Sequence, residues 1–322
     1  METLQEAIED KLKRRYRVFE DPESLLTENW PTPLLKLSKV SDETHEVWAK
    51  LEFYNPFSHS IKDRAIWNMF RKALEKGLHF DKLYEATSGN VGIALVALSN
   101  IYGKKFRAFI PKGTPETTEI LLKVLGAEVV RTEFEVIDRT FIEYVKKKAA
   151  EDKALNLNQF ENDANFEAHY NYTSLELLKQ LEVLGKKPKC IIAGVGTSGH
   201  IAALAARFKE TFYDVKVVGV EPSPGNKIPG IKRIETRPKW IAHVKIDEVV
   251  DVRSREAIEG AIEIARLEGI LIGLSSGAVY QAFKKIRNKY GPGTYILIFP
   301  DDAFKYIEEF REYLKPRTTF NY

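Results

Sequence analysis

The chain has 322 residues, of which 44% are hydrophobic and 30% charged, and its formal net charge is only +3. This length is typical of about two domains, and the composition excludes a disordered chain, a collagen-like chain and a disulfide-stapled miniprotein. The 49 basic residues nearly balance the 46 acidic ones and form no long run, which argues against nucleic acid or a membrane as partner.

The cysteine count and the N-terminal residues favour a cytoplasmic protein. Cys190 is the lone cysteine and cannot form an internal disulfide, as is usual in a reducing compartment. The first residues mix charged and apolar side chains, unlike a signal peptide, and no stretch reaches the roughly 20 apolar residues of a membrane span. The scarcity of Met, Cys and Gln favours a thermophilic source.

From about residue 46 onward, short apolar segments alternate with segments of helical periodicity, which predicts βα units around parallel sheets and an α/β fold. The expected strands are 46–52, 105–110, 127–132, 154–160, 189–194, 215–221, 269–273 and 295–300. The expected helices are 92–102, 117–125, 139–151, 166–184, 201–211, 255–268 and 278–290. Residues 222–240 lack periodicity and are rich in Pro, Gly, Lys and Arg, so we expect a long functional loop there.

Three Gly- and Ser-rich turns follow apolar segments and precede helices. They lie at 87–90, 194–200 and 273–277. In open α/β sheets, ligands bind at such turns, where backbone N–H groups at helix starts are exposed. The sequence therefore predicts a ligand site built from all three.

Two of these turns match other motifs. The second reads G-x-G-x-x-G, and Glu221 follows where a dinucleotide site would hold its ribose acid, so an NAD-dependent dehydrogenase is one alternative. The third reads G-x-S-x-G around Ser275, like a hydrolase nucleophile elbow, but no histidine follows it in the chain. Taken alone, the glycines could serve tight turns only, and Ser275 could serve as a helix cap.

Lys62 follows the Pro-containing loop 55–61 and begins an expected helix. A helix N-terminus disfavours an ammonium group and so favours the neutral amine that a Schiff-base lysine requires. On this evidence alone, a solvated surface lysine remains an alternative.

Taken together, these motifs resemble those of the fold type II pyridoxal-phosphate enzymes, and within them the cysteine synthase and cystathionine β-synthase family. The similar segments extend over nearly the whole chain, in the family's order: 32–34, N-P-x-x-S-x-K-D-R at 55–64, T-S-G-N at 87–90, Gln159-Phe160 with Asn162, Asn165 and His169, the glycine turn at 196–200, and 273–278. The resemblance implies two open twisted α/β domains of the tryptophan synthase β type, with the cofactor in the cleft between them. We expect residues 46–161 to form the smaller domain, with Lys62 and the 87–90 turn, and residues 1–45 plus 162–322 to form the larger.

The resemblance also implies a role for each site residue. Lys62 would carry pyridoxal 5′-phosphate as a Schiff base, Asn90 would bind the ring hydroxyl and Ser275 the pyridine nitrogen. The phosphate would be held by Gly196, Thr197, Ser198, Gly199 and His200, and the substrate carboxylate by Thr87, Ser88, Gly89 and Gln159. The family's phosphate turn usually reads G-T-G-G-T, so Ser198 and His200 are departures, and Val91 replaces a usual threonine. No metal site is expected.

The expected reaction is β-replacement, in which sulfide adds to an α-aminoacrylate made from an O-activated serine to give L-cysteine. Lys232 and Arg233 lie where acetyl-using relatives have a glycine-rich segment, and such cations suit a phosphate leaving group. We therefore expect O-phosphoserine, with O-acetylserine next and a solvated basic loop as the alternative. Cystathionine β-synthase or serine/threonine dehydratase activity on this fold also remains open. A homodimer acting on small molecules is the expected assembly.

Overall fold

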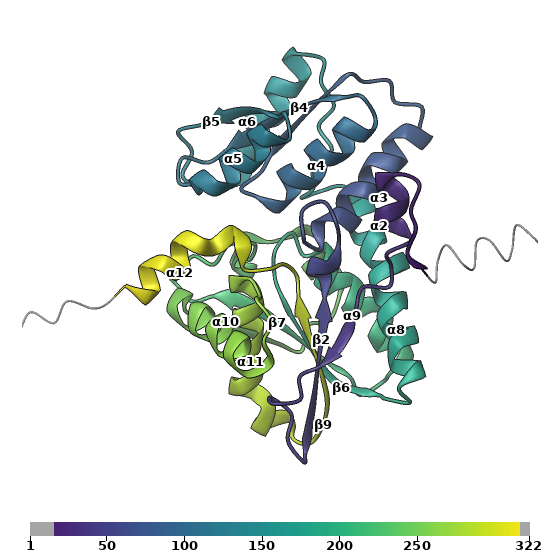
Figure 1. Ribbon diagram of the computed structural model, residues 1–322, viewed down its shortest axis with the longest axis vertical. Coiled ribbons are helices and arrows are strands. Elements are labelled where there is room, and N and C mark those ends of the chain that lie inside the picture. Colours follow the sequence, from purple (N-terminus) through teal and green to yellow (C-terminus); the bar gives the residue numbers. More distant parts are fainter. Residues whose placement is uncertain (1–15, 316–322) are drawn as a thin grey trace, which may run out of the picture.

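Two β-sheets flanked by helices organise the chain, which the computed structural model describes from residue 16 to residue 315 (Figure 1). The ends of the expected larger domain, residues 1–15 and 316–322, lie outside the described residues. No helix among the described residues is long and apolar enough to cross a membrane.

The larger sheet has six strands in the order β1-β2-β9-β6-β7-β8, and all neighbours are parallel except β1 and β2. The strands are β1 (Leu34–Lys36), β2 (His45–Leu51), β6 (Pro188–Gly194), β7 (Lys216–Pro222), β8 (Glu248–Val252) and β9 (Gly293–Phe299). Their apolar runs are continuous because both faces are covered. Alternate side chains of β6 show this: Ile192 packs with α10 (Ser254–Glu268) and α11 (Leu274–Tyr290), and Ile191 with α8 (Ser174–Val183) and α9 (Gly199–Thr211).

The smaller sheet is parallel, with the order β3-β4-β5, and lies at the top of Figure 1. Its strands are β3 (Lys82–Ala86), β4 (Lys105–Ile110) and β5 (Glu128–Arg131). One face packs on α3 (Lys62–Glu75), α4 (Asn90–Ile101) and α5 (Glu116–Val124), and the other on α6 (Arg139–Glu151). The remaining helices are α2 (Pro22–Thr27), α7 (Asp163–Ala168) and α12 (Ile307–Leu314), with a π-helical turn at His169–Thr173 and short 3₁₀ turns at 52–54, 234–236, 239–243 and 304–306.

The structure differs from the sequence-based expectation in four respects. Residues 154–160 and 269–273 form no strand but only isolated bridges, Leu83 to Leu155 and Ile272 to Asp302. The expected helix 166–184 is divided by the π-helical turn. The structure also has three short strands that the sequence analysis does not predict, β1, β3 and β8, which have only three to five residues each. Finally, β2 pairs with β9 in the larger sheet, whereas residues from 46 onward were assigned to the smaller domain.

Candidate active site

The predicted site residues come from loops and helix starts at the carboxyl ends of parallel strands in both sheets. Lys62 is the first residue of α3, Asn90 the first of α4, and Ser275 the second of α11. The 195–200 turn links β6 to α9. Because both sheets present such ends, their turns can face one ligand.

Lys62 is held by the loop that precedes it. The Asp63 carboxylate accepts hydrogen bonds from the Phe57 and Ser58 N–H groups at 2.8 and 3.0 Å, and Ser60 Oγ accepts one from the Lys62 N–H at 3.1 Å. Burial lowers the pKa of the Lys62 amine, while the charge of Asp301 raises it. The surroundings of Lys62 therefore favour the neutral amine more than water does.

A buried ionic network fixes α3 beneath this lysine. The Arg64 guanidinium donates to both carboxylate oxygens of Glu52, at 2.6 and 3.2 Å, and to Glu176 at 2.6 and 3.0 Å. Lys50 donates to Glu176 at 3.1 Å, and the Trp30 ring lies 4.6 Å from the Arg64 Cζ atom. Glu52, Arg64 and Lys50 are completely buried. The network therefore ties α3 both to the 3₁₀ turn that follows β2 and to α8.

The turn at 87–90 is stabilised by side-chain hydrogen bonds and linked to Gln159. Thr87 Oγ1 accepts hydrogen bonds from the Gly92 and Gly89 N–H groups at 2.9 and 3.2 Å, so its hydroxyl stabilises the turn itself. Gln159 is buried and its Nε2 donates to the Ala86 carbonyl at 3.2 Å. Ser88 is exposed. The structure thus brings Gln159 to the same turn as Thr87, Ser88 and Gly89.

Asn165 connects this region to the second turn. Its Nδ2 donates to the Gln159 carbonyl at 2.8 Å and to Thr197 Oγ1 at 3.0 Å. A Cβ on Gly196 would lie 2.6 Å from the Gly230 carbonyl oxygen, and one on Gly199 would lie 2.8 Å from Asn165 Oδ1. Both glycines are therefore required by close packing.

The second turn ends at the start of α9, where the first N–H groups of a helix are free to bind an anion. Ser198 adopts a left-handed conformation (φ 73°), and its Oγ accepts a hydrogen bond from the Trp240 N–H at 3.1 Å. His200 Nε2 is buried and has no hydrogen-bond partner among the described residues. Burial lowers the pKa of His200 to about 3, so the imidazole is neutral at pH 7. Its ring lies 5.4 Å from that of His169, in the π-helical turn.

Asp301 is the residue that sequence reasoning missed. It follows β9, is buried, and its Oδ2 accepts hydrogen bonds from Asn90 Nδ2 at 2.8 Å and from the Tyr306 hydroxyl. Its main-chain carbonyl accepts from the Gly273 N–H at 3.0 Å, just before Ser275. The available signal was an acid placed directly after a buried strand, where site residues of parallel sheets gather.

Lys232 and Arg233 lie in different surroundings despite being adjacent. Lys232 Nζ donates to the Ile137 carbonyl at 2.6 Å and lies 4.6 Å from the Phe160 ring centroid, next to Gln159. Burial lowers its pKa to about 8, Asp138 opposes this, and the charge of Lys62 adds to it.

Arg233 is instead held by carboxylates. Its guanidinium contacts Asp251 at 2.7 Å, Glu221 at 3.0 Å and Glu235 at 3.1 Å. Glu221 also accepts a hydrogen bond from the Ile234 N–H at 2.6 Å, so its carboxylate binds the loop that follows β7. The structure brings Lys232, but not Arg233, toward the other site residues.

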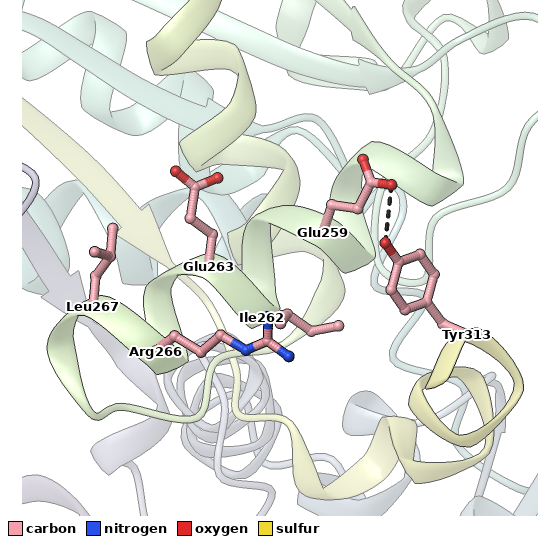
Figure 2. Close-up of a pocket in the computed structure, with 6 residues that line it drawn as sticks. All are labelled: Glu259, Ile262, Glu263, Arg266, Leu267 and Tyr313. Carbon is pink, nitrogen blue, oxygen red and sulfur yellow. Dashed lines mark hydrogen bonds between the residues drawn. The ribbon is translucent and has the colours of Figure 1, made fainter. Parts of the chain in front are cut away.

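A separate hollow of about 330 Å³ lies between α10 and α12 (Figure 2). Its lining includes Glu259, whose carboxylate accepts a hydrogen bond from the Tyr313 hydroxyl at 3.0 Å. No predicted site residue lines this hollow, and the candidate active site lies elsewhere.

A half-buried lysine, a helix start suited to an anion and a buried serine are therefore gathered at this site. Residues 25–301 match the pyridoxal-phosphate dependent enzyme family, and the chain belongs to that family. The cofactor is accordingly pyridoxal 5′-phosphate, and the fold is the type II fold that the sequence predicts.

Within the family, the chain is similar to cysteine synthases. The cysteine synthase of Aquifex aeolicus (strain VF5) is 32% identical over 292 residues, which cover 86% of this chain and 88% of the relative. Among solved structures, an O-ureido-L-serine synthase has a TM-score of 0.83 at 25% identity and covers 90% of this chain and 94% of its own. A hydrogen sulfide-producing enzyme from Fusobacterium nucleatum has a TM-score of 0.76 at 30% identity, covering 92% and 91%.

The residues of this chain fit the cofactor. Asn90 Oδ1 and His200 Nε2 are buried polar atoms without partners among the described residues. Asn90 lies at the start of α4, on the smaller sheet, and His200 at the start of α9, on the larger sheet. Buried polar atoms of this kind normally find a partner, so each is expected to bind a polar group of the cofactor or substrate. The start of α9 suits its phosphate.

Proposed function

We propose that the protein synthesises L-cysteine by β-replacement, using sulfide and O-phosphoserine as the activated serine. O-acetylserine is the next candidate substrate. The proposal is supported by the similarity to cysteine synthases and by one observation about this chain: the half-buried amine of Lys232 lies beside Phe160, close enough to Lys62 for the two charges to affect each other.

The proposed roles follow the chemistry of each side chain. When bound, pyridoxal phosphate supplies an aldehyde for the substrate amine and a ring that withdraws electrons from Cα. Lys62 would hold the cofactor and then accept the Cα proton. Ser275 would give the ring nitrogen one neutral hydrogen bond, and Asn90 would bind the ring hydroxyl. The turn at 196–200 would bind the phosphate.

Substrate binding is proposed to use the 87–89 turn and Lys232. The Ser88 N–H and hydroxyl would hold the substrate carboxylate, because the Thr87 and Gly89 N–H groups donate to the Phe109 carbonyl and Thr87 Oγ1. Gln159 would support the turn. Lys232 has three donors, of which one is used on the Ile137 carbonyl. The others would bind the phosphate leaving group and stabilise its charge as it departs. Arg233 is not proposed as a substrate contact, because three carboxylates surround its guanidinium.

The test compares two substrates in two variants. Lys232→Met removes the charge but keeps the length of the side chain. We expect kcat/KM for O-phosphoserine to fall about tenfold to a hundredfold, as the loss of a charge-assisted hydrogen bond implies, with little change for O-acetylserine. The matched control is Lys227→Met, an exposed lysine in the same loop, which should change neither value.

The pH dependence gives a second readout. The pKa of Lys232 is about 8, so its positive charge is present below that pH and lost above it. The preference for O-phosphoserine over O-acetylserine should therefore decline above about pH 8 in the wild type and be flat in Lys232→Met. Equal losses with both substrates, or a wild type that prefers O-acetylserine, would refute the phosphate assignment. Product formation from homocysteine or by simple deamination would instead indicate cystathionine β-synthase or dehydratase activity.

The homodimer, the cytoplasmic location and the thermophilic source stay predictions from the sequence.

A further inference from the structure

Asp301 is a buried carboxyl at the meeting point of three site segments. Its main chain forms a bridge with Ser60, two residues before Lys62, and accepts a hydrogen bond from Gly273, two residues before Ser275. Its side chain reaches Asn90 at the start of α4. One residue therefore connects segments from both sheets.

Its two carboxylate oxygens have different surroundings. Oδ2 accepts hydrogen bonds from Asn90 and Tyr306. Oδ1 is buried without a partner among the described residues, and a Cβ on Gly273 would lie 2.0 Å from it. Only glycine at 273 leaves this oxygen its space.

The pKa of Asp301 is raised overall, because burial outweighs the neighbouring groups that favour its ionised form. Burial raises the pKa of Asp301, and the charge of Lys305 and the hydrogen bonds from Tyr306 and Asn90 lower it. Asp302 raises it, but Asp302 itself pairs with Lys305 at 3.4 Å. The negative charge of Asp301 in turn raises the pKa of Lys62.

We propose that Asp301 is a positioning residue of this site, which fixes the Asn90 amide and acts as the counter-charge of the Lys62 amine. The inference depends on the proposed role of Lys62 and not on the identity of the leaving group. When Lys62 accepts the Cα proton, a C–H bond breaks and an N–H bond forms. The electron pair forms the Cα–Cβ double bond as the β-substituent departs with its own pair. The ammonium thus created lies in a buried site, where a carboxylate stabilises it.

The experiment measures the pKa of Lys62 directly in the cofactor-free protein, by competitive acetylation across a pH series with mass spectrometry of the labelled peptide. The variant is Asp301→Asn, which keeps the shape but removes the charge. Because an opposite charge raises the pKa of an amine, we expect the pKa of Lys62 to fall by about one to three units. Asp302→Asn is the matched control, an adjacent buried acid that pairs with Lys305, and should leave it nearly unchanged.

A second readout is the equilibrium affinity for pyridoxal phosphate, followed by fluorescence, which should weaken in Asp301→Asn because a neutral amide oxygen holds the Asn90 amide less strongly than a carboxylate does. Should Asp301→Asn fail to fold, Tyr306→Phe removes one donor from the same carboxylate and should move the pKa of Lys62 in the same direction by less.

An unchanged Lys62 pKa in these variants would overturn the inference. A different result, covalent cofactor retained in Lys62→Ala, would overturn the proposed role of Lys62 instead, so the two failures are distinguishable.

Discussion

The network beneath α3 predicts a large and pH-dependent loss of stability in Arg64→Met. Methionine is similar in size to arginine but cannot neutralise Glu52, which is completely buried. Removing one partner of a buried ion pair costs about 3–5 kcal/mol of the free energy of unfolding, because the other charge is left buried. We expect a loss in that range at pH 7.

The pKa of Glu52 gives a second, independent value for this loss of the free energy of unfolding. Burial raises this pKa, but the charges of Arg64 and Lys50 outweigh burial and lower it from 4.5 to about 2. The difference corresponds to about 3 kcal/mol of stability at neutral pH. Because the pKa in the folded state is depressed, this contribution is present above pH 4.5 and is lost as the pH falls toward 2. The difference in the free energy of unfolding between wild type and Arg64→Met should therefore narrow as the pH falls from 4.5 toward 2.

The assay is urea-induced unfolding of wild type and Arg64→Met at pH 7 and at several pH values between 5 and 3. Glu52→Gln in the Arg64→Met background should recover part of the loss, since it removes the unpaired carboxylate. Arg71→Met, a partly exposed arginine on the same helix, is the control and should cost no more than about 1 kcal/mol. A loss below about 1 kcal/mol in Arg64→Met, or a gap that does not narrow on acidification, would refute the reasoning.

Two further predictions concern the cofactor. Lys62→Ala should fold normally but lose turnover and the visible absorbance of the bound cofactor, and borohydride should then fix no cofactor to the chain; persistence of a reducible covalent bond would contradict the assignment. Gly196→Ala should weaken pyridoxal-phosphate binding, because its Cβ would lie 2.6 Å from the Gly230 carbonyl oxygen, and overpacking costs about 1–3 kcal/mol. Gly113→Ala, with no atom within 4 Å of the added carbon, should bind the cofactor normally in the same titration.

Local sequence patterns predicted the elements that carry the chemistry. The helix start at Lys62 and the apolar strand before the 195–200 turn follow from short-range features, a Pro-containing loop and a continuous apolar run. The order of the motifs along the chain predicted the family as well.

Local sequence patterns do not predict which segments distant in sequence lie side by side in the fold. The alternation of apolar residues shows that β2 is a strand but not that its partner is β9. Likewise, the opposite surroundings of Lys232 and Arg233 depend on Ile137, Phe160 and Asp251, which are distant in sequence. Asp301 lies after the last strand, and its relation to Asn90 required the fold.

The position of β9 between β2 and β6 has a consequence for how the protein is made. His45 pairs with Gly293, 248 residues later, so β2 leaves the ribosome long before its partner exists. The smaller sheet can form once the chain is synthesised as far as Arg131, where β5 ends. In the larger sheet, the edges of β2 and β6 that pair with β9 stay unpaired until nearly the whole chain is synthesised. Unpaired strand edges invite association with other chains. Nascent or prematurely terminated chains lacking β9 should therefore depend on chaperones, even though they already contain Lys62 and the 195–200 turn.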